Sequence, residues 1–206
     1  YPPLAMAGTF VGVNLYHISL EQWEKREITK TFGRYVSPSL VDKILAALGE
    51  GELKLGGEEH EVTVAFFDVR SFTSLSEKMS PEELVRALNI YLSVIIRAVL
   101  QYDGMINKFG GDSVMAIWNV PIACEGHTLL AVKAAVSAQR AIGELQSRET
   151  TLPKMEFGIG INTGKAVASN IGSEERLEYS VIGDTVNTAA RLGSATPGGK
   201  LWIGAN

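Results

Sequence analysis

Two aspartates follow predicted strands at positions where a carboxylate could hold a metal ion. Asp68 comes directly after the apolar, β-rich run Val62–Phe67, and Asp112 follows Gly110-Gly111, a dipeptide typical of a hairpin turn. If the strands are adjacent, the two carboxylates could hold a metal pair of the kind used in phosphoryl transfer. Each residue also has a plainer interpretation, because Asp68 could cap the following helix and Asp112 could be an ordinary turn residue.

A second candidate pair, Asn187 and Arg191, lies four residues apart in a predicted helix, so the two side chains share a face. An arginine beside an amide suits the negative charge that builds on a phosphate during its transfer. The loop Val69–Thr73 and the helix start after it could also offer backbone amides to phosphate oxygens. The alternative is a surface arginine and a helix-interior asparagine without catalytic roles.

Helix signals surround these residues. Ser80-Pro81 followed by Glu83 predicts a helix that starts with a capping box, and Asp103-Gly104 ends it. Its buried face is predicted from the spacing of Leu84, Leu88, Tyr91, Ile95 and Val99. The Ala-rich stretch Ala123–Leu145 predicts a second long helix, and Asp184 is expected to cap a last helix that runs through Arg191.

The predicted strands complete the fold class. Met105–Phe109 and Ser113–Trp118 form the hairpin, and Leu201–Ile203 is a late strand. In the stretch from Met155 to Asn162, apolar residues alternate with Glu, Gly and Asn, which predicts a half-buried strand. The order β-α-α-β-β-α-β-β-α-β predicts an α+β fold of ferredoxin-like type.

Composition limits the classes of function. The content of 46 % apolar and 20 % charged residues is that of a globular protein. A net charge of −4 argues against a nucleic-acid partner, since no basic surplus is present to neutralise phosphates. With Cys124 as the single cysteine, an internal disulfide is excluded.

Three zones are predicted along the chain. Residues 1–20 carry no charge, which predicts the end of a transmembrane segment, although a buried helix or strand of an upstream domain is the alternative. Lys25 and Arg26, just after that segment, favour a cytoplasmic location for the rest of the chain, with the protein in the cell membrane. Residues 21–60 are expected to form a connector helix and a linker, Gly49–Glu61, and residues 61–206 a catalytic domain. The connector could instead be an amphipathic helix packed on its own domain.

Three blocks of sequence carry a resemblance to a known family. They are Phe66–Thr73 (FFDVRSFT), Lys108–Asp112 (KFGGD) and Ile182–Arg191 (IGDTVNTAAR). In residues, order and separation they resemble the signature blocks of class III nucleotidyl cyclases, over about Glu61–Asn206. The resemblance implies the cyclase catalytic fold and, more narrowly, an adenylate cyclase of the bacterial membrane-anchored type, which makes cyclic AMP and pyrophosphate from ATP.

The resemblance also implies residue roles. Asp68, Asp112 and the Val69 carbonyl match the positions that hold two divalent cations, Mg²⁺ or Mn²⁺. Asn187 and Arg191 match the pair that orients the ribose and stabilises the transition state. Lys108 and Ser180 match the positions that read the purine, and Phe72 and Thr73 are predicted to contact the substrate. Lysine at the first purine position indicates adenine, whereas serine at the second can donate and accept and so reads the base less stringently.

In this family the active site is shared between two protomers. The resemblance therefore implies a homodimer in which Asp68 and Asp112 come from one chain and Lys108, Ser180, Asn187 and Arg191 from the other. The family's triphosphate-binding lysine is expected beyond Asn206, so we expect a catalytic domain cut short at its C-terminus, and Asn162 is assigned no role. The alternatives are a nucleotide-binding regulatory module without catalysis, a guanylate cyclase, and a diguanylate cyclase, whose turn motif the Gly110-Gly111 turn does not match.

Overall fold

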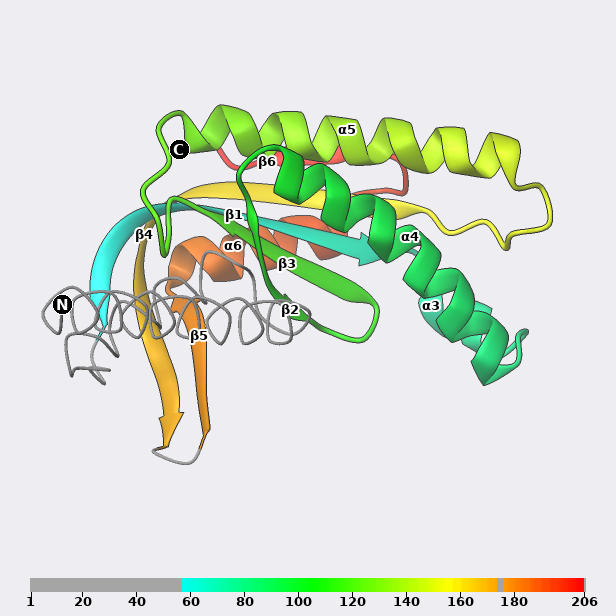
Figure 1. The fold of residues 1–206 in the computed structure, drawn as a ribbon, viewed down its shortest axis with the longest axis horizontal. Helices are drawn as coiled ribbons and strands as arrows, with labels where there is room; N and C mark the ends of the chain where they lie inside the picture. The colour runs from blue at the N-terminus through cyan, green and yellow to red at the C-terminus, as the bar shows by residue number, and fades with distance from the viewer. Residues whose placement is uncertain (1–56, 174–175, 206) are drawn as a thin grey trace, which may run out of the picture. The chain divides into compact units, whose positions relative to one another are not determined.

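The computed structural model of the chain describes residues 57–173 and 176–205. In chain order the elements are β1 (Glu58–Val69), α3 (Phe72–Ser76), α4 (Pro81–Gln101), β2 (Met105–Phe109), β3 (Ser113–Trp118), α5 (His127–Arg148), β4 (Phe157–Ser173), β5 (Arg176–Ile182), α6 (Asp184–Ala195) and β6 (Leu201–Ile203) (Figure 1). This is the predicted order of strands and helices. The predicted membrane segment and connector helix lie outside the described residues, and no helix within those residues is long and apolar enough to cross a membrane.

The strands form one sheet in the order β2-β3-β1-β4-β5, with β6 added beside β4. All pairs are antiparallel except β4 with β6, which is parallel. Strand β3 therefore lies between β1 and β2, which is the split βαβ arrangement of a ferredoxin-like fold. The mixed α+β class is confirmed.

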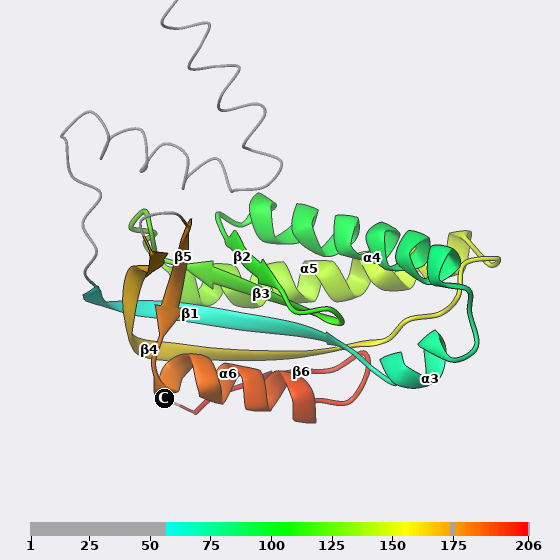
Figure 2. The same cartoon turned by 90° about the horizontal axis from the view of Figure 1, so that it is seen from below.

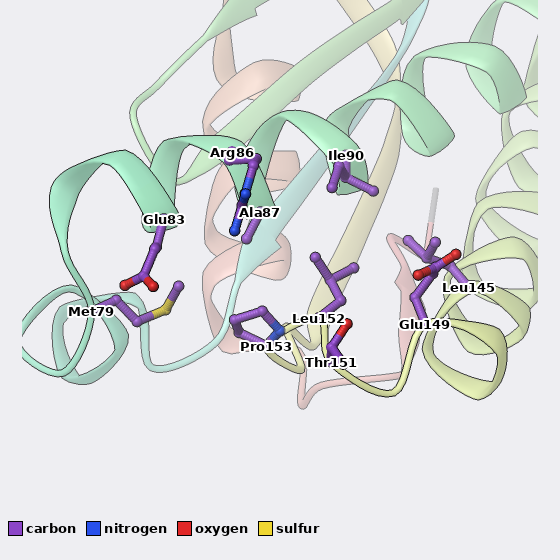
Figure 3. Close-up of a pocket in the computed structure, with 10 residues that line it drawn as sticks. All are labelled: Met79, Glu83, Arg86, Ala87, Ile90, Leu145, Glu149, Thr151, Leu152 and Pro153. Carbon is purple, nitrogen blue, oxygen red and sulfur yellow. The ribbon is translucent and has the colours of Figure 1, made fainter.

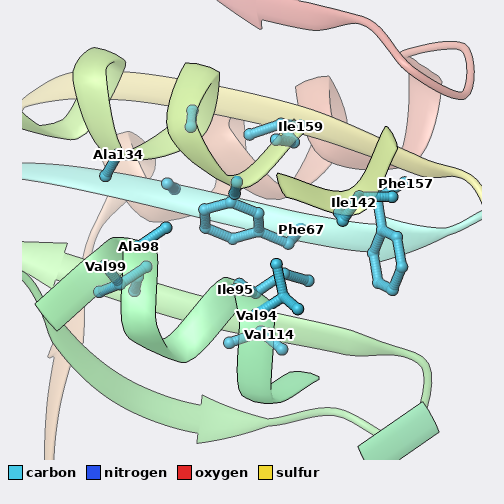
Figure 4. Packing of buried hydrophobic residues seen from close by; sticks show 14 of the residues in the cluster. Phe67, Val94, Ile95, Ala98, Val99, Val114, Ala134, Ile142, Phe157 and Ile159 are labelled. Atoms are coloured by element: carbon cyan, nitrogen blue, oxygen red, sulfur yellow. The ribbon is translucent and has the colours of Figure 1, made fainter. Parts of the chain in front are cut away.

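The two faces of the sheet are covered by different helices. Helices α4 and α5 lie on one face and α6 on the other, as the view in Figure 2 shows. On the first face Phe67 of β1 packs among Ile95 and Val99 of α4 and Ala134 of α5 (Figure 4). Phe66, the preceding residue of β1, points to α6 instead. Consecutive residues of β1 thus serve two cores, as strand alternation requires.

Helix α4 begins as its sequence predicts. The Ser80 hydroxyl accepts a hydrogen bond from the Glu83 amide at 3.2 Å, and the Glu83 carboxylate accepts one from the Ser80 amide at 3.2 Å. Tyr91, Ile95 and Val99 are buried, and Leu84 and Leu88 pack partly buried against the same core. Helix α4 is therefore capped at its start and packed along its length against the sheet face that it shares with α5.

Three predicted boundaries differ from the structure. Strand β1 begins at Glu58, inside the stretch expected as a linker. Helix α5 begins at His127 and not near Ala123, because Gly126 takes a left-handed conformation (φ 69°) that interrupts a helix. The N-cap of α6 is Gly183. Asp184, which was predicted to cap the helix, is instead its first residue.

The prediction that the start of β4 is half-buried is wrong. Gly158, Gly160 and Asn162, expected on an open face, are all buried. A Cβ on Gly160 would lie 2.1 Å from the Gly193 nitrogen of α6, and one on Gly193 would lie 2.8 Å from the Phe66 Cβ. Glycine alternation here marks a face on which a helix backbone lies directly against a strand.

We therefore expect Gly160→Ala to weaken the fold. The added methyl group must push α6 off the sheet, and overpacking of this kind costs about 3 kcal/mol in the free energy of unfolding. Urea denaturation followed by circular dichroism measures the change. Gly143→Ala is the matched control, because a Cβ there meets nothing within 4 Å and alanine favours the helix by about 0.5–1 kcal/mol. Equal stability of the two variants would contradict the close contact.

Candidate active site

Asp68 and Asp112 lie at the same end of neighbouring strands. Asp68 pairs in register with Ser113, and the Val69 amide donates a hydrogen bond to the Asp112 carbonyl at 2.9 Å. The turn that carries Asp112 is tight, since the Asp112 amide bonds the Gly110 carbonyl at 2.8 Å and Gly111 takes a left-handed φ of 68°. The predicted metal site required that the strands carrying the two aspartates be adjacent, and β1 and the β2–β3 hairpin are adjacent.

The Asp68 carboxylate lies in an environment that disfavours its charge. The pKa of Asp68 is raised above its ordinary value, mainly because burial disfavours the charged form. The nearby Arg70 guanidinium lowers that pKa, and the negative charge of Asp112 raises it further. A divalent cation between the carboxylates would relieve both the desolvation and the repulsion.

Arg70 holds Asp68 in place. Its guanidinium donates to the Asp68 carboxylate and to the Gly193 carbonyl, the latter at 3.0 Å, and also contacts the Ser194 carbonyl. One side chain therefore ties the end of β1 to the last turn of α6. Sequence reasoning gave Arg70 no role, although it stands inside the first signature block.

The donors present fit a magnesium or manganese site. Both ions prefer oxygen ligands, and Mg²⁺ is commonly bound by one or two carboxylates together with substrate phosphates. No cluster of three or more His, Cys, Asp and Glu suited to a metal occurs in the described part of the chain, so Asp68 and Asp112 would need phosphate, water or carbonyl oxygens as further ligands. Val69, between them, is the predicted source of one carbonyl.

One predicted purine-reading residue, Ser180, contacts Asn107, which is the chain neighbour of the other, Lys108. Lys108 is exposed on β2, and Ser180 is buried on β5. The Asn107 carboxamide donates to the Tyr179 carbonyl at 2.8 Å and accepts from the Ser180 hydroxyl at 3.2 Å. Asn107 therefore fastens β2 to β5, although these are the outer strands in the order β2-β3-β1-β4-β5.

Asn187 and Arg191 both lie on the exposed face of α6. The opposite face buries Thr185, Ala189 and Gly193 against the sheet. The helix start is fixed by Asn162, whose side-chain amide donates to the Thr185 carbonyl at 3.1 Å. Asn162, to which the sequence assigned no role, therefore supports the helix that presents the pair.

Phe72 and Thr73 open the short helix α3 just after the Asp68 loop. The Phe72 side chain packs partly buried against the main core, whereas Thr73 is exposed. The Thr73 carbonyl accepts hydrogen bonds from the Glu77 amide at 3.1 Å and the Ser76 hydroxyl at 2.7 Å. Their contact with substrate stays a prediction.

The structure brings Asp68, Val69 and Asp112 together at the end of β1 and the β2–β3 turn. Ser180 contacts Asn107, the neighbour of Lys108, and Asn187 and Arg191 lie together on α6. Within residues 57–173 and 176–205, no hydrogen bond or ion pair links the aspartates to Lys108, Ser180, Asn187 or Arg191. A groove of about 610 Å³ between α4 and the end of α5 (Figure 3) is lined by none of these residues.

The chain is similar to known nucleotidyl cyclases in both sequence and structure. The family model described as the adenylate and guanylate cyclase catalytic domain matches residues 57–206. "Adenylate cyclase 1" of Rhizobium meliloti is 39 % identical over 172 residues, which are 81 % of this chain and 25 % of that protein. The solved guanylyl cyclase Cya2 has a TM-score of 0.68 at 39 % identity, over 72 % of this chain and 76 % of that chain. The adenylyl cyclase CyaB from P. aeruginosa has a TM-score of 0.67 at 36 % identity, over 72 % and 79 %.

These similarities do not decide which purine the chain uses. An adenylyl and a guanylyl cyclase resemble it to nearly the same degree. The chain also spans only about a quarter to a third of the curated relatives that it matches, between 25 % and 30 % for several of them. The choice of base must therefore be argued from the residues that would face it.

We expect the stability of the protein to depend jointly on pH and on divalent cations. Because the pKa of Asp68 is raised by folding, the metal-free protein should lose stability as pH rises through that pKa, since the folded state holds the proton more tightly. At neutral pH, Mn²⁺ at ten times its dissociation constant should restore about 1.4 kcal/mol. Asp68→Asn should remove both effects.

Thermal unfolding across pH, with and without Mn²⁺, checks this expectation. Asp112→Asn should also abolish the Mn²⁺ effect, whereas the control Glu144→Gln, on exposed α5 surface, should keep it. Retention of the full Mn²⁺ effect in both aspartate variants would place the cation elsewhere.

Proposed function

The chain belongs to the adenylate and guanylate cyclase catalytic domain family, and from that membership we propose that it is an adenylate cyclase. Nucleotidyl cyclases are lyases, and this one is proposed to convert ATP to 3′,5′-cyclic AMP and pyrophosphate. The observation that carries the proposal is the pairing of Asp68 with the Asp112 turn at one end of two neighbouring strands.

In the proposed reaction the ribose 3′ oxygen forms a bond to the α-phosphorus of the same nucleotide. The bond from that phosphorus to the bridging oxygen of the β-phosphate breaks, pyrophosphate leaves, and the 3′ hydroxyl proton passes to solvent. Asp68 and Asp112, with the Val69 carbonyl, would hold two divalent cations, which when bound would activate the attacking oxygen and neutralise phosphate charge.

Asn187 and Arg191 are proposed to act on the nucleotide itself. Because α6 presents both on one exposed face, a nucleotide approaching that face meets an amide and a guanidinium together. The amide orients the ribose, and the guanidinium stabilises the charge that develops on the phosphate oxygens. Phe72 and Thr73 are proposed to line the substrate beside the aspartates.

Adenine is proposed as the base because of Lys108. Its ammonium group has donors and no acceptor, so it complements the ring nitrogen acceptor of adenine and not the corresponding N–H of guanine. Ser180 is proposed to face the 6-amino group. Ser180 donates a hydrogen bond to Asn107, the residue next to Lys108 in β2, which supports the proposal that Lys108 and Ser180 form one base-binding site.

A homodimer is proposed to complete the site. From the family resemblance we propose that Asp68 and Asp112 of one chain and Lys108, Ser180, Asn187 and Arg191 of the other complete each site across a two-fold axis. Attachment to the cell membrane through residues 1–20, with the catalytic domain in the cytoplasm, is proposed from the uncharged sequence of that segment.

We expect the purified protein, with Mn²⁺ or Mg²⁺, to form cyclic AMP from ATP and at least about tenfold less cyclic GMP from GTP. The double variant Lys108→Glu with Ser180→Cys should lose ATP turnover, since its donor and acceptor pattern no longer matches adenine. Chromatographic product assays measure both reactions, and Lys133→Glu, a charge reversal on exposed α5 surface, is the control.

Unchanged ATP turnover in the double variant would remove Lys108 and Ser180 from the base site. Efficient cyclisation of GTP by the unmodified protein would instead favour a guanylate cyclase. Binding of ATP and metal without turnover of either nucleotide would favour a regulatory module.

A further inference from the structure

Asn107 is an extra residue in strand β2. Ile106 pairs with Ala116 of β3 and Lys108 with Met115, so the register shifts at Asn107, which has no partner opposite it. Such a bulge re-aims side chains and is common beside functional sites. Here the released side chain reaches β5, where it contacts the backbone of Tyr179 and the side chain of Ser180.

The chemistry of the neighbours determines how the Asn107 carboxamide is turned. The Tyr179 carbonyl can only accept a hydrogen bond, so the group that meets it at 2.8 Å must be the Asn107 NH₂. The Asn107 oxygen then faces the Ser180 hydroxyl at 3.2 Å. That oxygen has no hydrogen to give, so the Ser180 hydroxyl must be the donor.

This arrangement consumes the donor capacity of Ser180. A serine hydroxyl has one hydrogen and two lone pairs. Ser180 is 3 % exposed, so water has little access to compete for that hydrogen. What the hydroxyl can still offer to a ligand is its lone pairs.

We propose that Asn107 is a specificity-determining positioning residue, which makes Ser180 an acceptor and so selects a 6-amino purine over a 6-oxo purine. The inference rests on the proposed function, in which Ser180 faces position 6 of the base. An amino group there donates to the Ser180 lone pairs. A keto oxygen there would place two acceptors against each other and leave both unsatisfied.

The consequence differs from the expectation drawn from sequence. Serine was expected to read the base less stringently because it can donate or accept. With Asn107 in place, Ser180 behaves as an aspartate would at this position, as an acceptor without a donor. Selection against a 6-oxo purine therefore depends on Asn107 and Ser180 together.

The test compares kcat/KM for ATP and for inosine triphosphate, which carries a 6-oxo group without the 2-amino group of GTP. Asn107→Ala frees the Ser180 hydrogen, so the ratio of inosine triphosphate to ATP should rise by roughly tenfold. Asn107→Asp loses the bond to the Tyr179 carbonyl as Asn107→Ala does, but its carboxylate still accepts from Ser180, so it should hold the original ratio. Lys108 is unchanged throughout, so its own preference cancels.

Two further measurements separate positioning from folding. The triphosphate of purine riboside has hydrogen at position 6, so any loss of kcat/KM with it in Asn107→Ala reports general damage, against which the other two nucleotides are compared. In a Ser180→Asp background the acceptor no longer depends on Asn107, so Asn107→Ala should leave the ratio unchanged.

Equal losses for all three nucleotides in Asn107→Ala would overturn the proposal and leave Asn107 a structural residue. A raised ratio that persists in the Ser180→Asp background would also overturn it, since the effect would not pass through Ser180. If the unmodified protein turns over no nucleotide, the proposed function fails. The same ratio measured by competitive binding would then still decide the role of Asn107.

Discussion

Helix α6 lies with its backbone directly against strand β4, because Gly158 and Gly160 on the strand place no side chain between them, and Gly193 on the helix leaves room for Phe66 of β1. That close approach brings the last carbonyls of α6 within reach of Arg70, which holds the Asp68 carboxylate. It also turns the opposite face of α6, with Asn187 and Arg191, outward. One packing constraint therefore affects both the position of Asp68, through Arg70, and the exposure of Asn187 and Arg191.

A second constraint acts between the outer strands β2 and β5. The bulge at Asn107 lets β2 and β5 be joined by side-chain hydrogen bonds, so the two predicted base-reading residues share one anchored framework. The aspartates have a different framework, made by the end of β1 and the hairpin turn. We propose that the two frameworks of one chain carry complementary halves of the site that the reaction needs.

Much of this could be predicted from sequence, because the signals were local. The capping box at Ser80, the hairpin around Gly110-Gly111 and the signature block that contains Asp68 each depend on a few neighbouring residues. Asn107 and Asn162, and the bond from Arg70 to Gly193, were missed because the carbonyls that they bind lie far along the chain. The type of an arginine or asparagine does not indicate which distant carbonyl it will bind. The buried face of β4 was missed because glycines that alternate with apolar residues were interpreted as a solvent-exposed face. Here they mark a face that contacts a helix backbone.

The central claim, that each chain carries two half-sites, is tested most directly by mixing two inactive variants. Asp68→Ala lacks a proposed metal ligand and Arg191→Ala lacks the proposed transition-state arginine, so each homodimer should be nearly inactive. In mixed dimers one site collects both defects and the other none, so cyclase activity should return, up to ~25 % of the unmodified protein on statistical mixing of a two-fold dimer. No recovery, although differently tagged variants are shown to associate, would mean that the aspartates and the arginine act within one chain, and would contradict the shared site.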